Sequence, residues 1–220
     1  MIKGIIFDAD GTLIDSMGIW QEVGIRYLKS LNIEAEPTLA KELFSLSMQE
    51  GCEHIKNHYN LNLSKSEIED GMFAIISQFY REDVELKKGI KDFLEELQQR
   101  QIPMCVATSS DIELLKSAFT RLDIYKYFKR IFSCKEFNTN KREAYIYHQV
   151  ADYMNTPPNQ TVVIEDVIFA VKSAKSAGFI TVGVSDAISI DDRSEIIATA
   201  DYFMEDYTDF NSFWNYVSSK

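Results

Sequence analysis

Apolar residues recur with two different spacings along the chain, and the change of spacing divides it. Between residues 15 and 85 they return every three or four positions, over 17–31, 38–59 and 66–80, which predicts amphipathic helices without strands. Residues 2–7 and the region after Gly89 instead alternate short apolar runs with helical stretches. The strands expected there are 2–7, 102–107, 131–133, 161–166, 180–184 and 201–204, and the helices are 90–100, 111–122, 142–154, 167–177 and 207–217.

Strands that alternate with helices favour a parallel sheet with helices on both faces. We therefore predict an α/β core over residues 1–14 and 86–220, interrupted after its first strand by an all-helical insertion over 15–85. Open parallel sheets bind ligands at the carboxyl ends of their strands. The residues that directly follow each strand are therefore the first candidates for a functional site.

Bulk composition narrows the class of protein. A chain of 220 residues with 45% hydrophobic and 26% charged residues is typical of a soluble globular protein. The net charge of -11 and the pI of about 4.8 argue against nucleic acid or an anionic membrane as a partner. The three widely spaced cysteines form no zinc or disulfide pattern, and the first apolar stretch is too short for a signal peptide. We expect a cytoplasmic protein, and we expect it to be a monomer.

Polar residues of a few selected types follow four of the predicted strands. They are Asp8 and Asp10 after the first strand, Thr108, Ser109 and Ser110 after the second, Lys141 beyond the third, and Glu165 and Asp166 at the end of the fourth. Carboxylates, hydroxyls and one ammonium group at neighbouring strand ends indicate one shared site rather than a solvated rim.

The residue types predict chemistry on a phosphate group. Asp8, Glu165 and Asp166 offer the hard oxygen ligands that Mg²⁺ prefers, and a bound cation offsets the repulsion among them. Two acids in one site can differ in pKa, so that one is a nucleophile and the other a general acid and base. Hydroxyl and N–H donors just before a helix, together with Lys141, would hold the phosphate.

Four segments of the chain resemble the four ordered motifs of the haloacid dehalogenase superfamily: DADGTLIDS, ATSS, Lys141 and VVIEDVIFAVKSAKSAG. The first motif is specific, and the nearest resemblance is to the β-phosphoglucomutase-like and phosphoglycolate-phosphatase-like subfamily. The resemblance implies a Rossmann-like core with a mobile helical cap, here residues 15–85.

The resemblance also implies roles for individual residues. It makes Asp8 the nucleophile that forms an aspartyl-phosphate, and Asp10 the general acid and base, which also gives a backbone carbonyl to Mg²⁺. Thr108 and Lys141 would hold the phosphoryl group, whereas Asp166 would bind Mg²⁺ and Glu165 would support it directly or through water. Ser109, which lies with Thr108 just before a predicted helix, is a further candidate for binding the phosphate.

Two segments depart from the usual motifs. The lysine lies in Asn140-Lys141-Arg142-Glu143-Ala144-Tyr145, without the prolines that the family often has, and Lys135 is a nearby competitor. We favour Lys141 because it lies just before a predicted helix. The usual Glu-Asp-Ser is here Glu165-Asp166-Val167, which removes a hydroxyl near the expected metal.

Asp10 favours phosphate esters, because an alkoxide leaving group needs a proton donor. Mutases of the family carry a histidine near the position of Trp20 and an arginine in the loop that is here SLSMQEG, residues 45–51. Both are absent, so we predict a Mg²⁺-dependent phosphatase acting on a small phosphorylated metabolite. A β-phosphoglucomutase-type mutase is the nearest alternative, and a phospho-aspartate receiver-like signalling domain is an alternative of another class.

Overall fold

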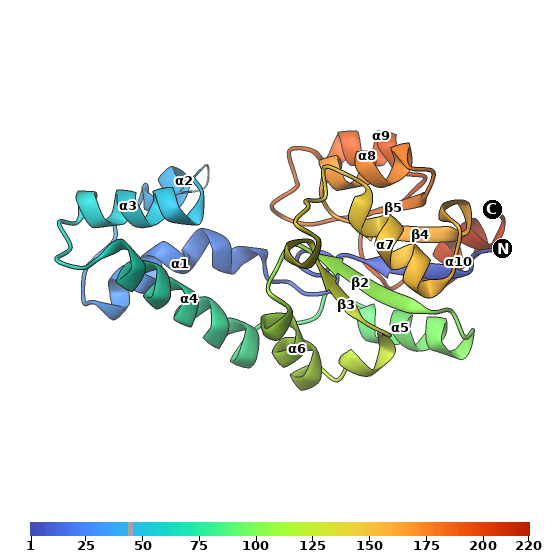
Figure 1. Cartoon of the computed structure of the whole chain (residues 1–220), viewed down its shortest axis with the longest axis horizontal. Helices are drawn as coiled ribbons and strands as arrows, with labels where there is room; N and C mark the ends of the chain where they lie inside the picture. Colours follow the sequence, from blue (N-terminus) through green and yellow to red (C-terminus); the bar gives the residue numbers. More distant parts are fainter. Residues whose placement is uncertain (44–45) are drawn as a thin grey trace. The chain divides into compact units, whose positions relative to one another are not determined.

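The computed structural model describes residues 1–43 and 46–220, which divide into two compact units (Figure 1). One unit contains residues 1–15 and 85–220, and the other contains residues 16–84. Ser45, the first residue of the loop segment SLSMQEG, lies outside the described residues. Within the described residues, no helix combines the length and the apolar character that a membrane crossing requires.

The larger unit is built on a parallel sheet, which has six strands within the described residues. The strand order is β3-β2-β1-β4-β5-β6. Successive strands are added on one side of β1 up to β3 and on its other side from β4 onward, and doubly wound sheets bind ligands at this switch point between β1 and β4. The strands are β1 (Gly4–Phe7), β2 (Met104–Thr108), β3 (Ile131–Ser133), β4 (Thr161–Glu165), β5 (Ile180–Val184) and β6 (Tyr202–Met204). This arrangement confirms the predicted α/β fold with a Rossmann-like core.

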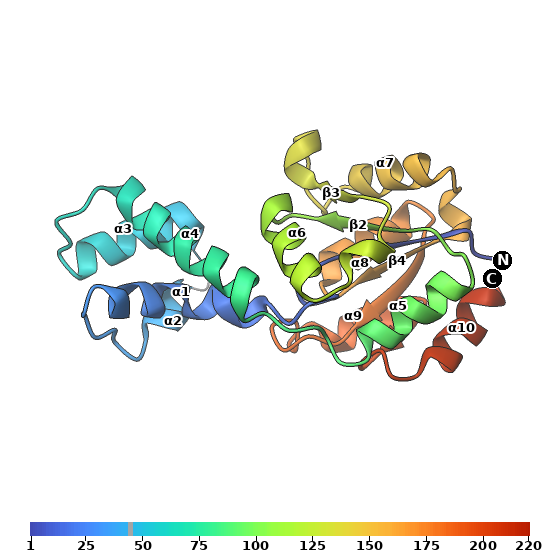
Figure 2. The ribbon, with the colours of Figure 1, turned by 90° about the horizontal axis from the view of Figure 1, so that it is seen from below.

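Helices cover both faces of the sheet (Figure 2). Successive side chains of a strand point to opposite faces, and the central strands are buried throughout, so both faces need a covering layer. Ile6 packs in the cluster that includes Ile146 and Val150 of α7 on one face. Phe7, the next residue, lies edge-on to Phe93 of α5, with ring centroids 6.5 Å apart. The helices of this unit are α5 (Ile90–Gln99), α6 (Ile112–Arg121), α7 (Tyr145–Met154), α8 (Ile168–Ser176), α9 (Arg193–Thr199) and α10 (Phe210–Ser218).

The smaller unit is helical in its described residues, as the periodicity predicts. It contains α1 (Met17–Ser30), α2 (Leu39–Leu43), α3 (Met48–His58) and α4 (Lys65–Glu82). The single helix expected over 38–59 is wrong, because α3 has its own start. Ser47 caps α3 in a reciprocal capping box with Glu50, and such a box begins a helix.

The register of the central strands places the proposed site residues next to one another. Phe7 of β1 pairs with Ile164 of β4, and the backbone N–H of Asp8 donates to the Ile164 carbonyl over 3.0 Å. Asp8 therefore leaves the sheet beside Glu165. The strand does not continue to Asp10, because β1 ends at Phe7 and Gly11 turns the chain with a φ of 83°.

Candidate active site

Three acids that the sequence places at two strand ends meet in a buried cluster. Asp8 follows β1, Glu165 is the last residue of β4 and Asp166 comes directly after it. Each offers one carboxylate oxygen to a set whose members all lie within 4.8 Å of one another. The exposed fractions of Asp8, Glu165 and Asp166 are 7%, 1% and 1%. Acids are rarely buried so deeply unless a cation or donors stabilise them, so the cluster indicates a functional site.

Lys141 supplies one compensating charge. Its ammonium group donates to Asp8 Oδ1 and to Glu165 Oε1, the latter over 2.7 Å. An ammonium has three donors, so one remains for an oxygen of a ligand. Burial alone would lower the pKa of Lys141, but the carboxylates of Asp8 and Glu165 raise it, which keeps the side chain charged.

The segment that carries Lys141 is a turn rather than the start of a helix. The side chain of Asn140 accepts a hydrogen bond from the Arg142 backbone N–H over 2.9 Å, and α7 begins at Tyr145 instead of at residue 142. Asparagine forms such turns readily, so the Asn140 side chain stabilises this turn in a segment that lacks the usual prolines. Lys135, the competing lysine, lies exposed, and the geometry favours Lys141.

The cluster is short of positive charge. Burial raises the pKa of Asp8 to about 7; Lys141 opposes this shift, while Glu165 and Asp10 add to it. Burial also raises the pKa of Asp166 well above its ordinary value, and the charges of Asp8 and Glu165 raise it further. A single lysine therefore does not offset the acids that surround it.

Two carboxylate oxygens show where a cation would bind. Glu165 Oε2 and Asp166 Oδ2 are buried and have no hydrogen-bond partner. The other oxygen of Asp166 accepts a hydrogen bond from the Thr12 hydroxyl over 3.1 Å, which orients the carboxylate. Buried oxygens without donors are costly, and hard oxygen ligands suit Mg²⁺, so the residues present fit this ion.

Asp10 and Thr108 are linked through Ser110. The Ser110 hydroxyl donates to Asp10 Oδ2 over 2.6 Å, and the Ser110 backbone N–H donates to Thr108 Oγ1 over 2.9 Å. The Ser133 hydroxyl holds the carbonyl of Ser110 over 3.1 Å. The motifs predict no separate role for Ser110, although Asp111, the N-cap of α6, marks it as part of the turn before that helix.

Ser109 lies differently from its neighbours. It is exposed, and its hydroxyl lies 3.7 Å from Cys134 Sγ, in contrast to the buried side chain of Thr108. Its expected role in holding phosphate stays a prediction.

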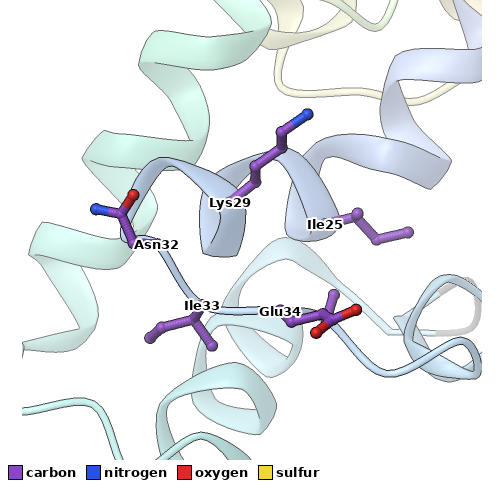
Figure 3. Close-up of a pocket in the computed structure, with 6 residues that line it drawn as sticks. Ile25, Lys29, Asn32, Ile33 and Glu34 are labelled. Atoms are coloured by element: carbon purple, nitrogen blue, oxygen red, sulfur yellow. The ribbon is translucent and has the colours of Figure 1, made fainter.

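A separate hollow belongs to the helical unit alone (Figure 3). It has a volume of about 470 Å³ and lies between the end of α1 and the segment that follows. Its lining residues are Ile25, Lys29, Asn32, Ile33, Glu34 and Ala35. One lysine, one glutamate and one asparagine beside three apolar side chains do not form a catalytic constellation, so the acid cluster stays the candidate active site.

The sequence model of the haloacid dehalogenase-like hydrolases matches residues 5–184, which is most of the chain and includes every candidate site residue. The chain belongs to this family. A phosphorylated carbohydrates phosphatase from Thermotoga maritima is 26% identical over 181 residues, which cover 80% of this chain and 82% of that protein. A 6-phosphogluconate phosphatase from Escherichia coli is 22% identical over 179 residues, covering 80% of each chain.

Solved structures of haloacid dehalogenase-like proteins agree on the fold. A candidate β-phosphoglucomutase from Thermotoga maritima superposes with a TM-score of 0.87 and 23% identity, over 97% of this chain and 99% of that one. The predicted family and enzyme class are confirmed: the chain is a haloacid dehalogenase-type phosphoric monoester hydrolase. The receiver-like alternative loses its support, because the family matched is one of enzymes.

Proposed function

We propose that this hydrolase is a Mg²⁺-dependent phosphatase that removes phosphate from a small phosphorylated carbohydrate through an aspartyl-phosphate on Asp8. The observation that carries the proposal is the buried arrangement of Asp8, Lys141 and the unpartnered oxygens of Glu165 and Asp166. A nucleophilic carboxylate, a cation and a place for a metal are the groups that phosphoryl transfer needs.

The first half of the reaction uses the two aspartates in different roles. Asp8 attacks phosphorus, the ester P–O bond breaks, and Asp10 gives its proton to the departing alkoxide. Lys141 and Thr108 hold the phosphoryl oxygens; Lys141 has a third donor for this purpose, and the hydroxyl of Thr108 can donate while it accepts from Ser110.

The second half restores the enzyme. Asp10 takes a proton from water, the water oxygen attacks phosphorus, and the bond between phosphorus and Asp8 breaks to release inorganic phosphate. Asp8, Glu165 and Asp166, with the backbone carbonyl of Asp10, would hold Mg²⁺. A bound Mg²⁺ supplies positive charge beside the phosphoryl oxygens and lets the buried acids stay ionised.

The substrate class follows from the relatives. The two phosphatases named above act, by their names, on phosphorylated carbohydrates and on 6-phosphogluconate. We extend the first of these classes to this chain, because the relative so named is 26% identical and the match covers most of both chains. The particular sugar is to be found by experiment.

The test is release of inorganic phosphate from a panel of hexose, pentose and hexitol phosphates, with glycolytic phosphates and nucleotides for comparison. Each compound is assayed with Mg²⁺ and with chelator. We expect metal-dependent release that is fastest with sugar phosphates. If no compound of the panel releases inorganic phosphate in the presence of Mg²⁺, the proposal is contradicted.

The mutase is the second candidate, since one of the similar structures is that of a candidate β-phosphoglucomutase. A mutase returns the phosphoryl group to a second hydroxyl of the sugar instead of to water. Conversion of a hexose 1-phosphate to its 6-phosphate without release of phosphate would favour it. Trp20, at the place of the mutase histidine, argues for hydrolysis.

A further inference from the structure

Tyr147, in α7, brings a phenolic hydroxyl into the acid cluster. The residue is fully buried and packs in the hydrophobic cluster that includes Ile6 of β1 and Val163 of β4. Its ring lies edge-on to Phe179, with centroids 6.1 Å apart. Its hydroxyl donates to Glu165 Oε1 over 2.7 Å. Packing alone would be served by phenylalanine, so the hydroxyl requires another explanation.

The hydroxyl makes the two oxygens of Glu165 different. Oε1 accepts from Tyr147 and from Lys141, each over 2.7 Å. Oε2 is buried and accepts from no group in the described part of the chain. Two donors on one oxygen occupy its lone pairs and fix the rotation of the carboxylate. Glu165 therefore has a single oxygen left for a cation.

We propose that Tyr147 is a positioning residue that limits Glu165 to one-oxygen binding of a divalent cation, and that it thereby favours Mg²⁺ over Ca²⁺. Mg²⁺ demands a small octahedral shell, whereas Ca²⁺ readily takes both oxygens of a carboxylate. The inference rests on the proposed function, because it assigns the metal site to these acids. It adds a residue that selects the ion.

The protonation of Tyr147 is consistent with this role. Burial raises the pKa of its hydroxyl well above the ordinary value, and the charge of Glu165 raises it further. Groups that orient a metal ligand in this way set metal affinity from outside the coordination shell.

The experiment compares Tyr147→Phe with Tyr145→Phe, a change of the same kind on the same helix. Tyr145 is 48% exposed and touches the ring of Phe137, outside the acid cluster. Titration calorimetry on the metal-free full chain measures the Kd for Mg²⁺ and, separately, for Ca²⁺. We expect Tyr147→Phe to weaken Mg²⁺ binding about 10-fold and Ca²⁺ binding much less, while Tyr145→Phe matches the wild type.

A double-mutant cycle separates positioning from a general effect on the fold. In a Glu165→Gln background, Tyr147→Phe should cause no further change in the ratio of the two Kd values, because the carboxylate that it orients is gone. An additional change of ratio in that background would overturn the inference.

Equal weakening of both ions in Tyr147→Phe, or tighter Mg²⁺ binding, would also overturn it. The failure of the inference differs visibly from failure of the proposed function. If the wild type releases phosphate with Mg²⁺ while Tyr147→Phe keeps the wild-type ratio, the inference alone fails. If the wild type binds neither ion and releases no phosphate, the proposed function fails as well.

Discussion

Ser110 donates its hydroxyl hydrogen to Asp10 Oδ2 over 2.6 Å. The serine is itself fixed, because its backbone N–H donates to Thr108 and its carbonyl accepts from Ser133. One turn after β2 thus orients both the proposed general acid and a proposed phosphate-binding hydroxyl. In the proposed mechanism, this link makes Ser110 a positioning residue for the proton transfers of Asp10.

Replacing Ser110 by alanine should lower kcat about 10-fold with little change in KM, because the Asp10 carboxyl loses the hydrogen bond that orients it, and such a bond contributes about 0.5–1.5 kcal/mol. Steady-state kinetics on the best substrate measures both constants. Ser109→Ala is the companion variant; as a predicted phosphate-binding residue, it should change KM more than kcat. An unchanged kcat in Ser110→Ala would show that Asp10 needs no such support.

The stability of the metal-free protein should fall as the pH rises, owing to Asp8. Its pKa is about 7 in the folded chain against an ordinary value of 3.8. The folded state then holds the proton more tightly than the unfolded state. The stabilisation that this group contributes is complete below about pH 3.8 and is lost as the pH rises through about 7.

Asp8→Asn removes this titration, so the free energy of unfolding of the variant should exceed that of the wild type by a growing margin from pH 4 to pH 8. We expect a gap of at least about 2 kcal/mol at pH 8. Denaturant unfolding in chelator measures it, with Asp152→Asn, an exposed acid of α7, as the control. A gap that narrows with rising pH would refute the account of Asp8.

Mg²⁺ should stabilise the folded chain by relieving the unpartnered oxygens of Glu165 and Asp166. An ion at 100 times its Kd adds about 2.7 kcal/mol to the free energy of unfolding. We expect the melting temperature to rise with Mg²⁺ and to fall again with chelator. Asp166→Asn should lose most of this response and Asp152→Asn should keep it; an equal response in both variants would place the ion elsewhere.

The sequence predicts the strands of this fold well because most of them are short buried apolar runs. Residues 131–133 and 180–184 are strands with the predicted bounds. Helix starts are harder to predict, because they depend on caps rather than on periodicity. Ser47 and Glu50 form a capping box whose signal is present in the sequence, and this signal indicates the boundary between α2 and α3. The sequence pattern does not predict α9, because the apolar pattern of this helix is short.

The acids of the candidate site could be predicted because each lies at the end of a strand or soon after it, and neighbouring strands bring such residues together. Ser110 and Tyr147 could not be predicted in the same way. In the sequence, Ser110 cannot be told apart from Ser109. Only the geometry of the turn determines which of the two hydroxyls bonds to Asp10. Tyr147 looks like one more apolar position of α7, and only the tertiary packing brings its hydroxyl to Glu165.

The most direct test of the central claim is phosphate release by Asp8→Asn, measured beside the wild type at saturating Mg²⁺ on the best substrate. Asparagine keeps the shape of the side chain but is no nucleophile toward phosphorus. We predict that the variant folds, as shown by its circular dichroism and melting curve, and releases no phosphate above the uncatalysed background. Release at a rate comparable to that of the wild type would contradict the proposal that Asp8 carries the phosphoryl group.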